Sequence, residues 1–376
     1  MIPFRSQVSL ERLTYEAVQW LTNIRFMNPE PTALNDDDRQ MLQRWSASYA
    51  DLRRELATAI VGCDEVLEQL LIALLAHGHC LIEGVAGTAK SRMAEAIARC
   101  LSLDFRRLGL TPETRPADIT GTEQAVEDHG GPRTIALQRG PLFANVVVAD
   151  GLPHARPKLQ MLLLDAMRER HVEIGGTRYE LPEPFLLVAT QNPSEPDAPH
   201  PIPAAQLDRF LLKIVLRYPS YDDEYRIAAG PPAALAHLRA VASATEILAL
   251  QSLVRRLPPP PPIVHYALRL VRTTRVHEGE EHDFVLEWVS CGAGTRGVQA
   301  LIDAATSRAL LHGRTTVTAA DLQAIAHPVL RHRLVTNTHA ASNGVTPDRV
   351  IDRLIAETPE RVPGDDQPSA SMSAMT

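Results

Sequence analysis

The most constraining feature of this chain of 376 residues is a glycine-rich turn between an apolar run and an amphipathic segment. The run reads CLIE over residues 80–83, the turn reads GVAGTAKS over 84–91, and helical spacing continues in RMAEAIARCL. A short, nearly continuous apolar run predicts a strand buried on both faces. A helix that begins directly after it points backbone N–H groups and the positive end of its dipole into the turn. The segment therefore predicts an anion-binding loop.

The residues of this turn fit a phosphate-binding loop. We expect backbone N–H groups from Val85 to Ser91 to surround a triphosphate, Lys90 to reach its β and γ oxygens, and Ser91 to bind Mg²⁺. Ala89 stands where the general motif has a second glycine, and we expect it to serve with a negative φ. A turn with an ordinary surface lysine is the alternative. The expected nucleotide-binding residues are Gly84, Val85, Ala86, Gly87, Thr88, Ala89, Lys90, Ser91 and Arg92.

Three more apolar runs follow and alternate with helical spacing. They read NVVVAD over 145–150, FLLVAT over 185–190 and LLKIVL over 211–216. This alternation is typical of an α/β fold, in which a parallel sheet is covered by helices on both faces. Asp150 ends the first of these strands, where it would hold Mg²⁺ together with Ser91. Asn192 follows the second, where its amide would orient an attacking water, although Asn before Pro is also a common turn pair.

The pattern becomes helical after residue 219. Ser220 with Asp223, and Thr318 with Asp321, have the spacing of capping boxes. Five prolines at 258–262 predict a stiff connector between helices, with a polyproline recognition site as the alternative. We divide the chain into a helical N-terminal arm (1–51), an αβα core (52–219), a helical domain (220–340) and a C-terminal segment (341–376) that is mostly a disordered tail.

Composition excludes several classes of protein. The chain has 38 basic and 45 acidic residues, a net charge of −7, and no basic stripe, so binding to nucleic acid is not expected. Its four cysteines have no paired spacing, which argues against a zinc cluster or a disulfide framework. The N-terminus lacks a signal-peptide layout, and no apolar run reaches the roughly 18 to 20 residues of a membrane span. We expect a cytoplasmic protein.

A set of motifs between about residues 52 and 340 resembles the MoxR-type AAA+ ATPases. In chain order they read GVAGTAKS, RPADITGTE, RGPLFANVVVAD, LPEPFLLVATQNP, AQLDRFLLKI, GAGTR and HPVLRHR. The resemblance implies an AAA+ αβα domain with parallel sheet, followed by an all-α lid, that binds ATP and Mg²⁺. It also implies ATP hydrolysis and a homo-oligomeric ring, usually hexameric. Stretches 121–141 and 171–184 resemble hairpins that face the pore of such rings, with ordinary surface hairpins as the alternative.

The same resemblance assigns further catalytic residues. Arg209 in LDRF resembles the arginine finger that reaches a neighbour's γ-phosphate, and Arg296 in GAGTR resembles the sensor-two arginine of the lid. Together with Asn192 they form the expected catalytic set. Surface ion pairing is the alternative for either arginine.

The chain departs from the family after Asp150. Family members usually have a glutamate there that polarises the attacking water, and this chain has Gly151. Losing a general base typically lowers the rate by about 10² to 10⁴. We therefore expect weakened hydrolysis, and a rise of more than tenfold in turnover for Gly151→Glu. Nothing in the sequence fixes His154 toward the phosphate as a substitute base.

Two functions remain open. The first is a chaperone-like remodeller of a protein client, for which the resemblance also suggests a partner with a von Willebrand factor A domain. The second is a nucleotide-binding scaffold or switch that assembles with ATP but hydrolyses it little or not at all.

Overall fold

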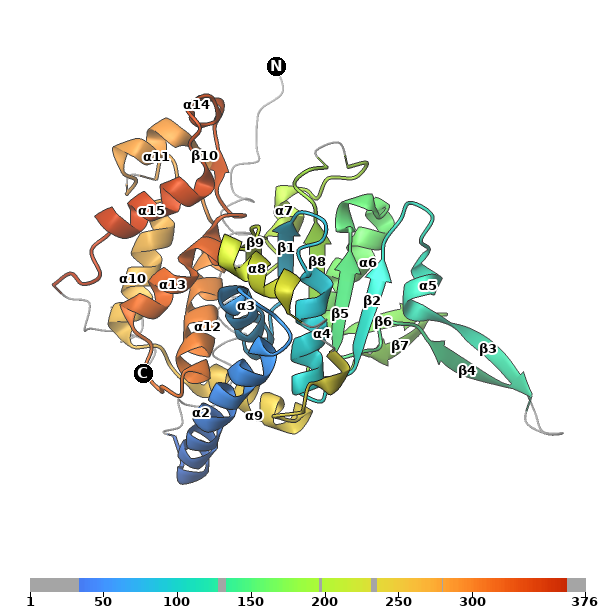
Figure 1. The fold of residues 1–376 in the computed structure, drawn as a ribbon. Coiled ribbons are helices and arrows are strands. Elements are labelled where there is room, and N and C mark those ends of the chain that lie inside the picture. The colour runs from blue at the N-terminus through green and yellow to red at the C-terminus, as the bar shows by residue number, and fades with distance from the viewer. Residues whose placement is uncertain (1–33, 128–132, 196–197, 231–234, 279, 364–376) are drawn as a thin grey trace, which may run out of the picture.

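The computed structural model describes residues 34–127, 133–195, 198–230, 235–278 and 280–363 (Figure 1). Its centre is a parallel five-stranded sheet in the order β2-β5-β8-β1-β9. The strands are β1 (Cys80–Gly84), β2 (Phe105–Gly109), β5 (Val146–Asp150), β8 (Leu186–Gln191) and β9 (Leu212–Leu216). The α/β class and the four strands expected from the sequence are confirmed.

Successive side chains of these strands enter two separate cores. Ile82 and Val148 pack into the core that contains α3 (Asp64–Leu75) and α4 (Lys90–Cys100). Leu81 packs into the core that contains α6 (Pro157–Glu169). Because successive side chains of a strand point to opposite faces, continuous apolar runs are required when both faces are covered.

Within the five-stranded sheet, sequence reasoning missed β2. It reads FRRLG, and of its side chains only Leu108 is buried, while Arg106 and Arg107 are exposed. It pairs only with β5 among the described strands and so forms one edge of the sheet. An edge strand does not need apolar side chains at every position, which explains why this one lacked the expected signature.

Two hairpins interrupt the αβα core. The first joins β3 (Gly121–Glu127) to β4 (Arg133–Arg139) and projects from the body of the molecule (Figure 1). Residues 128–132, between the two strands of this expected hairpin, lie outside the described residues. The second joins β6 (His171–Ile174) to β7 (Thr177–Glu180). Gly175 and Gly176 form its tip with φ of 58° and 84°, as expected of glycines in a tight turn.

A helical domain follows the sheet, as expected. Its helices of nine or more residues are α8 (Tyr221–Ala229), α9 (Ala244–Arg256), α10 (Pro261–Arg272), α12 (Thr295–Leu311), α13 (Ala319–Leu330) and α15 (Pro347–Glu357). Ser220 caps α8 by accepting from the backbone N–H of Asp223, and Thr318 with Asp321 forms a capping box at α13. The proline run ends inside the first turn of α10, where proline is well tolerated.

Short elements complete the described chain. They are α5 (Pro116–Thr120), η1 (Leu152–His154), α7 (Ala204–Leu207), η2 (Leu235–His237), α11 (Asp283–Trp288), β10 (Val289–Cys291), β11 (Val335–Thr336) and α14 (Thr338–Ser342).

At both ends of the chain, the observed helices do not coincide with the divisions expected from the sequence. Helix α2 (Asp36–Ala57), capped by Asn35, runs without a break across the boundary drawn at residue 51. Residues 1–33 of the expected arm lie outside the described part. At the opposite end, α15 lies within the segment expected to be mostly disordered. Its Val350, Ile351 and Leu354 are buried against the main core, and this apolar face explains why the segment is helical.

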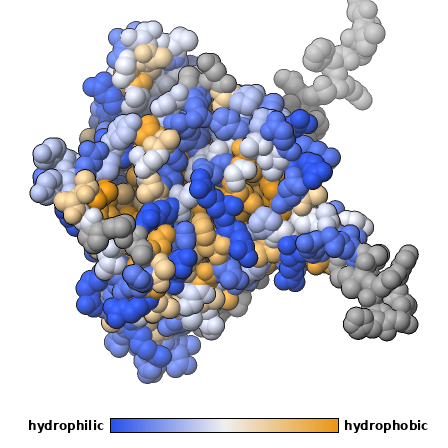
Figure 2. All heavy atoms as spheres, turned by 45° about the vertical axis from the view of Figure 1, so that its right-hand side comes forward, coloured by the Kyte–Doolittle hydropathy of each residue, from blue (hydrophilic) through white to orange (hydrophobic). Residues whose placement is uncertain are grey.

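None of the helices in the described residues is both long enough and apolar enough to span a membrane. The face seen in Figure 2 is mostly hydrophilic, with apolar side chains gathered in patches near its middle.

Candidate nucleotide-binding site

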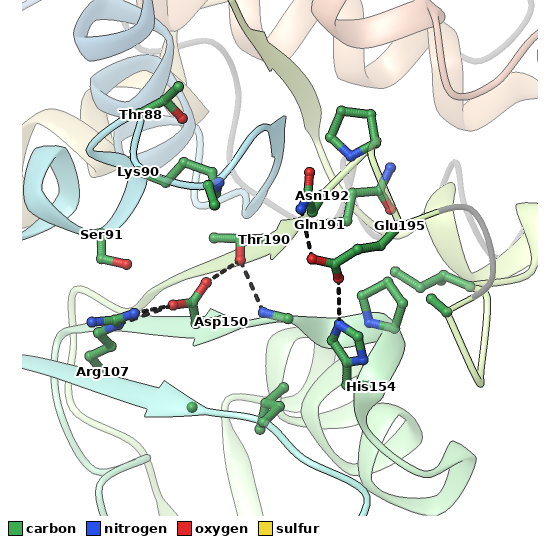
Figure 3. A pocket seen from close by; sticks show the side chains of 18 of the residues that line it. Thr88, Lys90, Ser91, Arg107, Asp150, His154, Thr190, Gln191, Asn192 and Glu195 are labelled. Atoms are coloured by element: carbon green, nitrogen blue, oxygen red, sulfur yellow. Dashed lines mark hydrogen bonds and ion pairs between the residues drawn. The ribbon is translucent and has the colours of Figure 1, made fainter.

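A cavity of about 910 Å³ opens at the carboxyl edge of the sheet (Figure 3). Its walls include the loop after β1, the ends of β5 and β8, and the segment that follows β8. The structure brings Lys90, Ser91, Asp150 and Asn192 together around it. Ala86 to Arg92 all line the cavity, whereas Gly84 and Val85 do not line it, and their carbonyl oxygens accept from Lys90.

The loop positions Lys90 through its own backbone. Lys90 Nζ donates to the carbonyl oxygens of Gly84 and Val85 at 2.7 Å each. Thr88 Oγ1 donates to the Val85 carbonyl at 2.8 Å, which closes the turn. An ammonium group carries three donors, so Lys90 can hold these carbonyls and still reach a phosphate oxygen. Burial lowers the pKa of Lys90, and the carboxylates of Asp150 and Glu195 act in the opposite direction.

The backbone at Ala89 corrects the sequence expectation. Ala89 has φ 62° and ψ 22°, in the left-handed region, and not the negative φ that we expected. It directly precedes Lys90, the first residue of α4, so it makes the reversal from loop to helix. A left-handed residue with a Cβ costs roughly 1–2 kcal/mol. The position therefore retains the conformation for which glycine is preferred, even though alanine occupies it.

Asp150 is held at the end of β5 by two donors. Thr190 Oγ1 donates to its Oδ1 at 2.6 Å, and Arg107 Nε donates to its Oδ2 at 3.1 Å. Burial raises the pKa of Asp150, but the hydrogen bonds from Thr190 and Arg107 outweigh it and keep the pKa below its ordinary value. The group is thus a carboxylate at neutral pH.

These residues fit a magnesium ion. Figure 3 shows the Ser91 hydroxyl and the Asp150 carboxylate on the same side of the cavity. Both present hard oxygen atoms, and Mg²⁺ in phosphate sites typically takes one or two protein oxygens along with phosphate oxygens and water. Ser91 and Asp150 would hold the ion, and Arg107 would share the Asp150 carboxylate with it.

Gly151 adopts a conformation that favours glycine. Its φ is 79° and its ψ is 45°, and its N–H donates to Thr190 Oγ1 at 3.0 Å. A Cβ built on Gly151 would lie 3.0 Å from His154 Cδ2. A side chain at this position would therefore meet the imidazole ring.

The segment after β8 places a second carboxylate at the cavity. Asn192 Nδ2 donates to Glu195 Oε1 at 2.7 Å, and Asn192 Oδ1 accepts from the Ser194 N–H at 3.1 Å. His154 Nε2 lies 2.8 Å from Glu195 Oε2. Asn192 thus lines the cavity as expected, but its amide is engaged within its own turn. Glu195 therefore fixes the His154 ring, a contact that the sequence did not indicate.

The two arginines lie elsewhere. Arg209 and Arg296 line a second hollow of about 320 Å³, and neither lines the larger cavity. Arg209 Nη1 donates to Asp165 Oδ1 at 3.1 Å, and Arg296 Nη1 donates to Asp208 Oδ2 at 2.7 Å. Within one subunit the structure therefore separates both arginines from Lys90 and Asp150.

Sequence reasoning missed two charged residues of the cavity. Arg107 lies on the unrecognised edge strand, and Glu195 lies in a loop with no periodic pattern. The only sequence signal for Glu195 was its position three residues after Asn192, a spacing that favours a local side-chain hydrogen bond.

Two family models match parts of this chain. Residues 79–212 match the ATPase family associated with various cellular activities, and residues 287–354 match the AAA lid domain. The chain is 39% identical to "Chaperone MoxR1" of Mycobacterium tuberculosis over 80% of this chain and 79% of that protein. It is 33% identical to the uncharacterized protein YeaC of Bacillus subtilis, over 79% of this chain and 90% of that protein.

A solved structure supports the same assignment. The crystal structure of a candidate ATPase from Cytophaga hutchinsonii superposes with a TM-score of 0.76 at 29% identity, over 85% of this chain and 97% of that one. The matches extend through both the sheet domain and the helical lid. This chain belongs to the MoxR family of AAA+ ATPases.

Proposed function

We propose that this chain binds Mg²⁺ and ATP in the 910 Å³ cavity and uses ATP hydrolysis to remodel a protein client. The observation that carries the proposal is the meeting of Lys90, Ser91 and Asp150 around one cavity at the start of α4. Residues 80–91 place a cation and helix N–H groups beside it, which suits a polyanion. The ordered lid and the relationship to the MoxR family support a chaperone-like role.

The nucleotide would be bound mainly by the loop. Backbone N–H groups at the start of α4 would face the phosphates, and Lys90 would contact the β and γ oxygens. Mg²⁺, when bound, neutralises charge that develops on the phosphate oxygens during transfer. Ser91 and Asp150 would hold it, and the lowered pKa of Asp150 keeps that ligand ionised.

Assembly would complete the catalytic site. Arg209 lies on a hollow separate from the cavity, as suits an arginine finger that acts on a neighbouring subunit's nucleotide, and Arg296 on the same hollow would serve as the sensor-two arginine of the lid. A homo-oligomeric ring, usually hexameric in such ATPases, would bring the two surfaces together. The resemblance to the MoxR family alone suggests that the ring acts with a partner that carries a von Willebrand factor A domain.

The second candidate is an ATP-dependent scaffold or switch that hydrolyses ATP little or not at all. The observation that favours it is Gly151, which has no side chain to polarise a water next to Asp150. Hydrolysis weakened by about 10² to 10⁴ would leave binding intact.

Phosphate release by wild type and by Lys90→Ala, measured with ATP and Mg²⁺, separates the two. Release that depends on Lys90 supports the remodeller. Equal background release from both proteins, with ATP binding lost only in Lys90→Ala, supports the scaffold. Absence of ATP binding by wild type contradicts both candidates.

A further inference from the structure

Glu195 lies at the cavity with both carboxylate oxygens held by neighbours from two different segments. Asn192 Nδ2 donates to Oε1, and His154 Nε2 contacts Oε2. From this arrangement we infer that Glu195 is the catalytic carboxylate that orients the attacking water and takes its proton, the task for which Gly151 has no side chain. The inference rests on the proposed ATP hydrolysis and names a residue for it.

The position of Glu195 suits a water between it and the terminal phosphate. It lines the same cavity as Lys90 and Asp150, and its charge acts on the ammonium of Lys90. Figure 3 shows Glu195 across the cavity from Ser91, with Asp150 and Thr190 between them in the view. Its side chain is 46% exposed, so water reaches the carboxylate.

The protonation state also suits this role. Hydrogen bonds from Asn192 and His154 lower the pKa of Glu195, so the group is an anion at neutral pH. An ionised carboxylate accepts and does not donate, so the His154 proton resides on Nε2. A carboxylate offers about four lone-pair sites, and the two recorded bonds leave room for a water.

His154 acts as a positioning residue in this arrangement. It ends η1, the short helix that follows Gly151, and its ring lies in the direction of a Cβ at Gly151. The absence of a side chain at Gly151 leaves space for the ring, and the ring in turn holds Glu195. The base therefore comes from the segment after β8 and not from the end of β5.

The step is a hydrolysis. The water oxygen bonds to the γ-phosphorus while the bond from that phosphorus to the β,γ-bridging oxygen breaks. The bridging oxygen keeps the electron pair and leaves as part of ADP. One proton of the water passes to the Glu195 carboxylate and later to solvent. Because the transition state of phosphoryl transfer is loose, a carboxylate of low pKa can serve by orienting the water and accepting its proton late.

The test is single-turnover hydrolysis of γ-³²P-labelled ATP by the full chain, with ATP affinity measured in parallel. Glu195→Gln keeps the size and one acceptor oxygen but removes the base. We expect it to bind ATP like wild type and to hydrolyse it about 10²- to 10⁴-fold more slowly, so that protein-bound nucleotide is recovered as ATP. His154→Gln should slow the reaction less, and adding it to Glu195→Gln should cost nothing further, because both act through one group.

A matched control is Glu287→Gln. Glu287 is also an exposed glutamate paired with a histidine, His339, at 3.3 Å, but it lies on α11 in the lid. The Glu287→Gln protein should hydrolyse ATP at the wild-type rate. Wild-type hydrolysis by Glu195→Gln, or an equal loss in Glu287→Gln, overturns the inference.

The proposed ATPase activity is tested separately, by comparing wild type with Lys90→Ala. Hydrolysis by wild type that exceeds Lys90→Ala establishes the ATPase, whatever Glu195→Gln does. Equal hydrolysis by wild type and Lys90→Ala removes the ATPase, and the role of Glu195 with it. Thermal unfolding of Glu195→Gln at the wild-type temperature shows that a lost rate is not a lost fold.

Discussion

Arg107 donates to the Asp150 carboxylate across the ends of two paired strands, β2 and β5. The contact occupies Asp150 Oδ2 with a cation at the place where Mg²⁺ would bind. The Arg107 side chain is 60% exposed, so the pair is worth only about 0.2–1 kcal/mol. Arg107 therefore helps to keep Asp150 ionised and would compete with the metal for that carboxylate.

Arg107→Ala should lower the Mg²⁺ concentration needed for half-maximal ATP binding by about two- to fivefold, the equivalent of an exposed ion pair. The measurement is a Mg²⁺ titration at fixed ATP. Arg106→Ala, at the adjacent exposed position, is the control and should leave the midpoint in place. A higher midpoint in Arg107→Ala would mean that this arginine contributes to nucleotide binding.

Gly151→Glu should not raise turnover more than tenfold, contrary to the expectation from sequence. Gly151 has a left-handed φ, which destabilises a residue that carries a Cβ by roughly 1–2 kcal/mol. The new Cβ would also press on the His154 ring, which holds Glu195. We expect a loss of stability of that size in urea unfolding and no gain in ATP hydrolysis. A faster variant of wild-type stability would show that the segment adapts to a glutamate here.

Arg209→Ala should lower turnover without weakening ATP binding by an isolated subunit. An arginine that acts in trans on a phosphoryl group contributes about 10³ to 10⁵ in rate in related chemistry. Asp165→Asn is the matched control, because it breaks the same ion pair and keeps the arginine. Equal effects of the two variants on turnover would show that only the ion pair matters.

Asp321 should be a large contributor to the stability of the lid. Its buried carboxylate accepts from Arg308 Nη1 at 2.6 Å and from Arg314 Nη1 at 2.7 Å. Removing one member of a buried charged group typically costs about 3–5 kcal/mol. Asp321→Asn should lose this amount in urea unfolding at neutral pH. Asp36→Asn, which breaks an exposed pair, should lose less than about 1 kcal/mol.

The contribution of Asp321 should depend on pH in one direction. Burial raises its pKa, but the bonds from Arg314, Thr318 and Arg308 prevail and lower the pKa to about 2. The unfolded value is about 3.9, so the stabilisation is complete above that pH and is lost as pH falls toward 2. The difference in unfolding free energy between wild type and Asp321→Asn should therefore shrink below about pH 4. A difference that grows on acidification would contradict the assignment.

The sheet was predictable because burial on both faces demands unbroken apolar runs, and β1, β5, β8 and β9 have them. Edge strand β2 was not predictable in this way, because its Arg106 and Arg107 are exposed and interrupt the apolar run. Helix α15 was predictable in principle, since Val350, Ile351 and Leu354 have helical spacing. The polar residues around them favoured the interpretation of a disordered tail.

The site was predictable to the extent that its residues are close in sequence. Lys90 and Ser91 follow directly from the loop, and Asp150 follows from the end of a strand. The contact between His154 and Glu195 joins residues 41 positions apart in two irregular segments. Only the topology of the sheet, which places β5 beside β8, brings them together.

Binding of labelled ATP with Mg²⁺ to wild type and to Lys90→Ala tests the central claim most directly. Lys158→Ala, an exposed lysine on α6 outside the cavity, is the control. We predict saturable binding by wild type and Lys158→Ala and a loss of affinity in Lys90→Ala. The contradicting result is a wild-type protein that takes up no ATP, or one whose affinity is unchanged when Lys90 is removed.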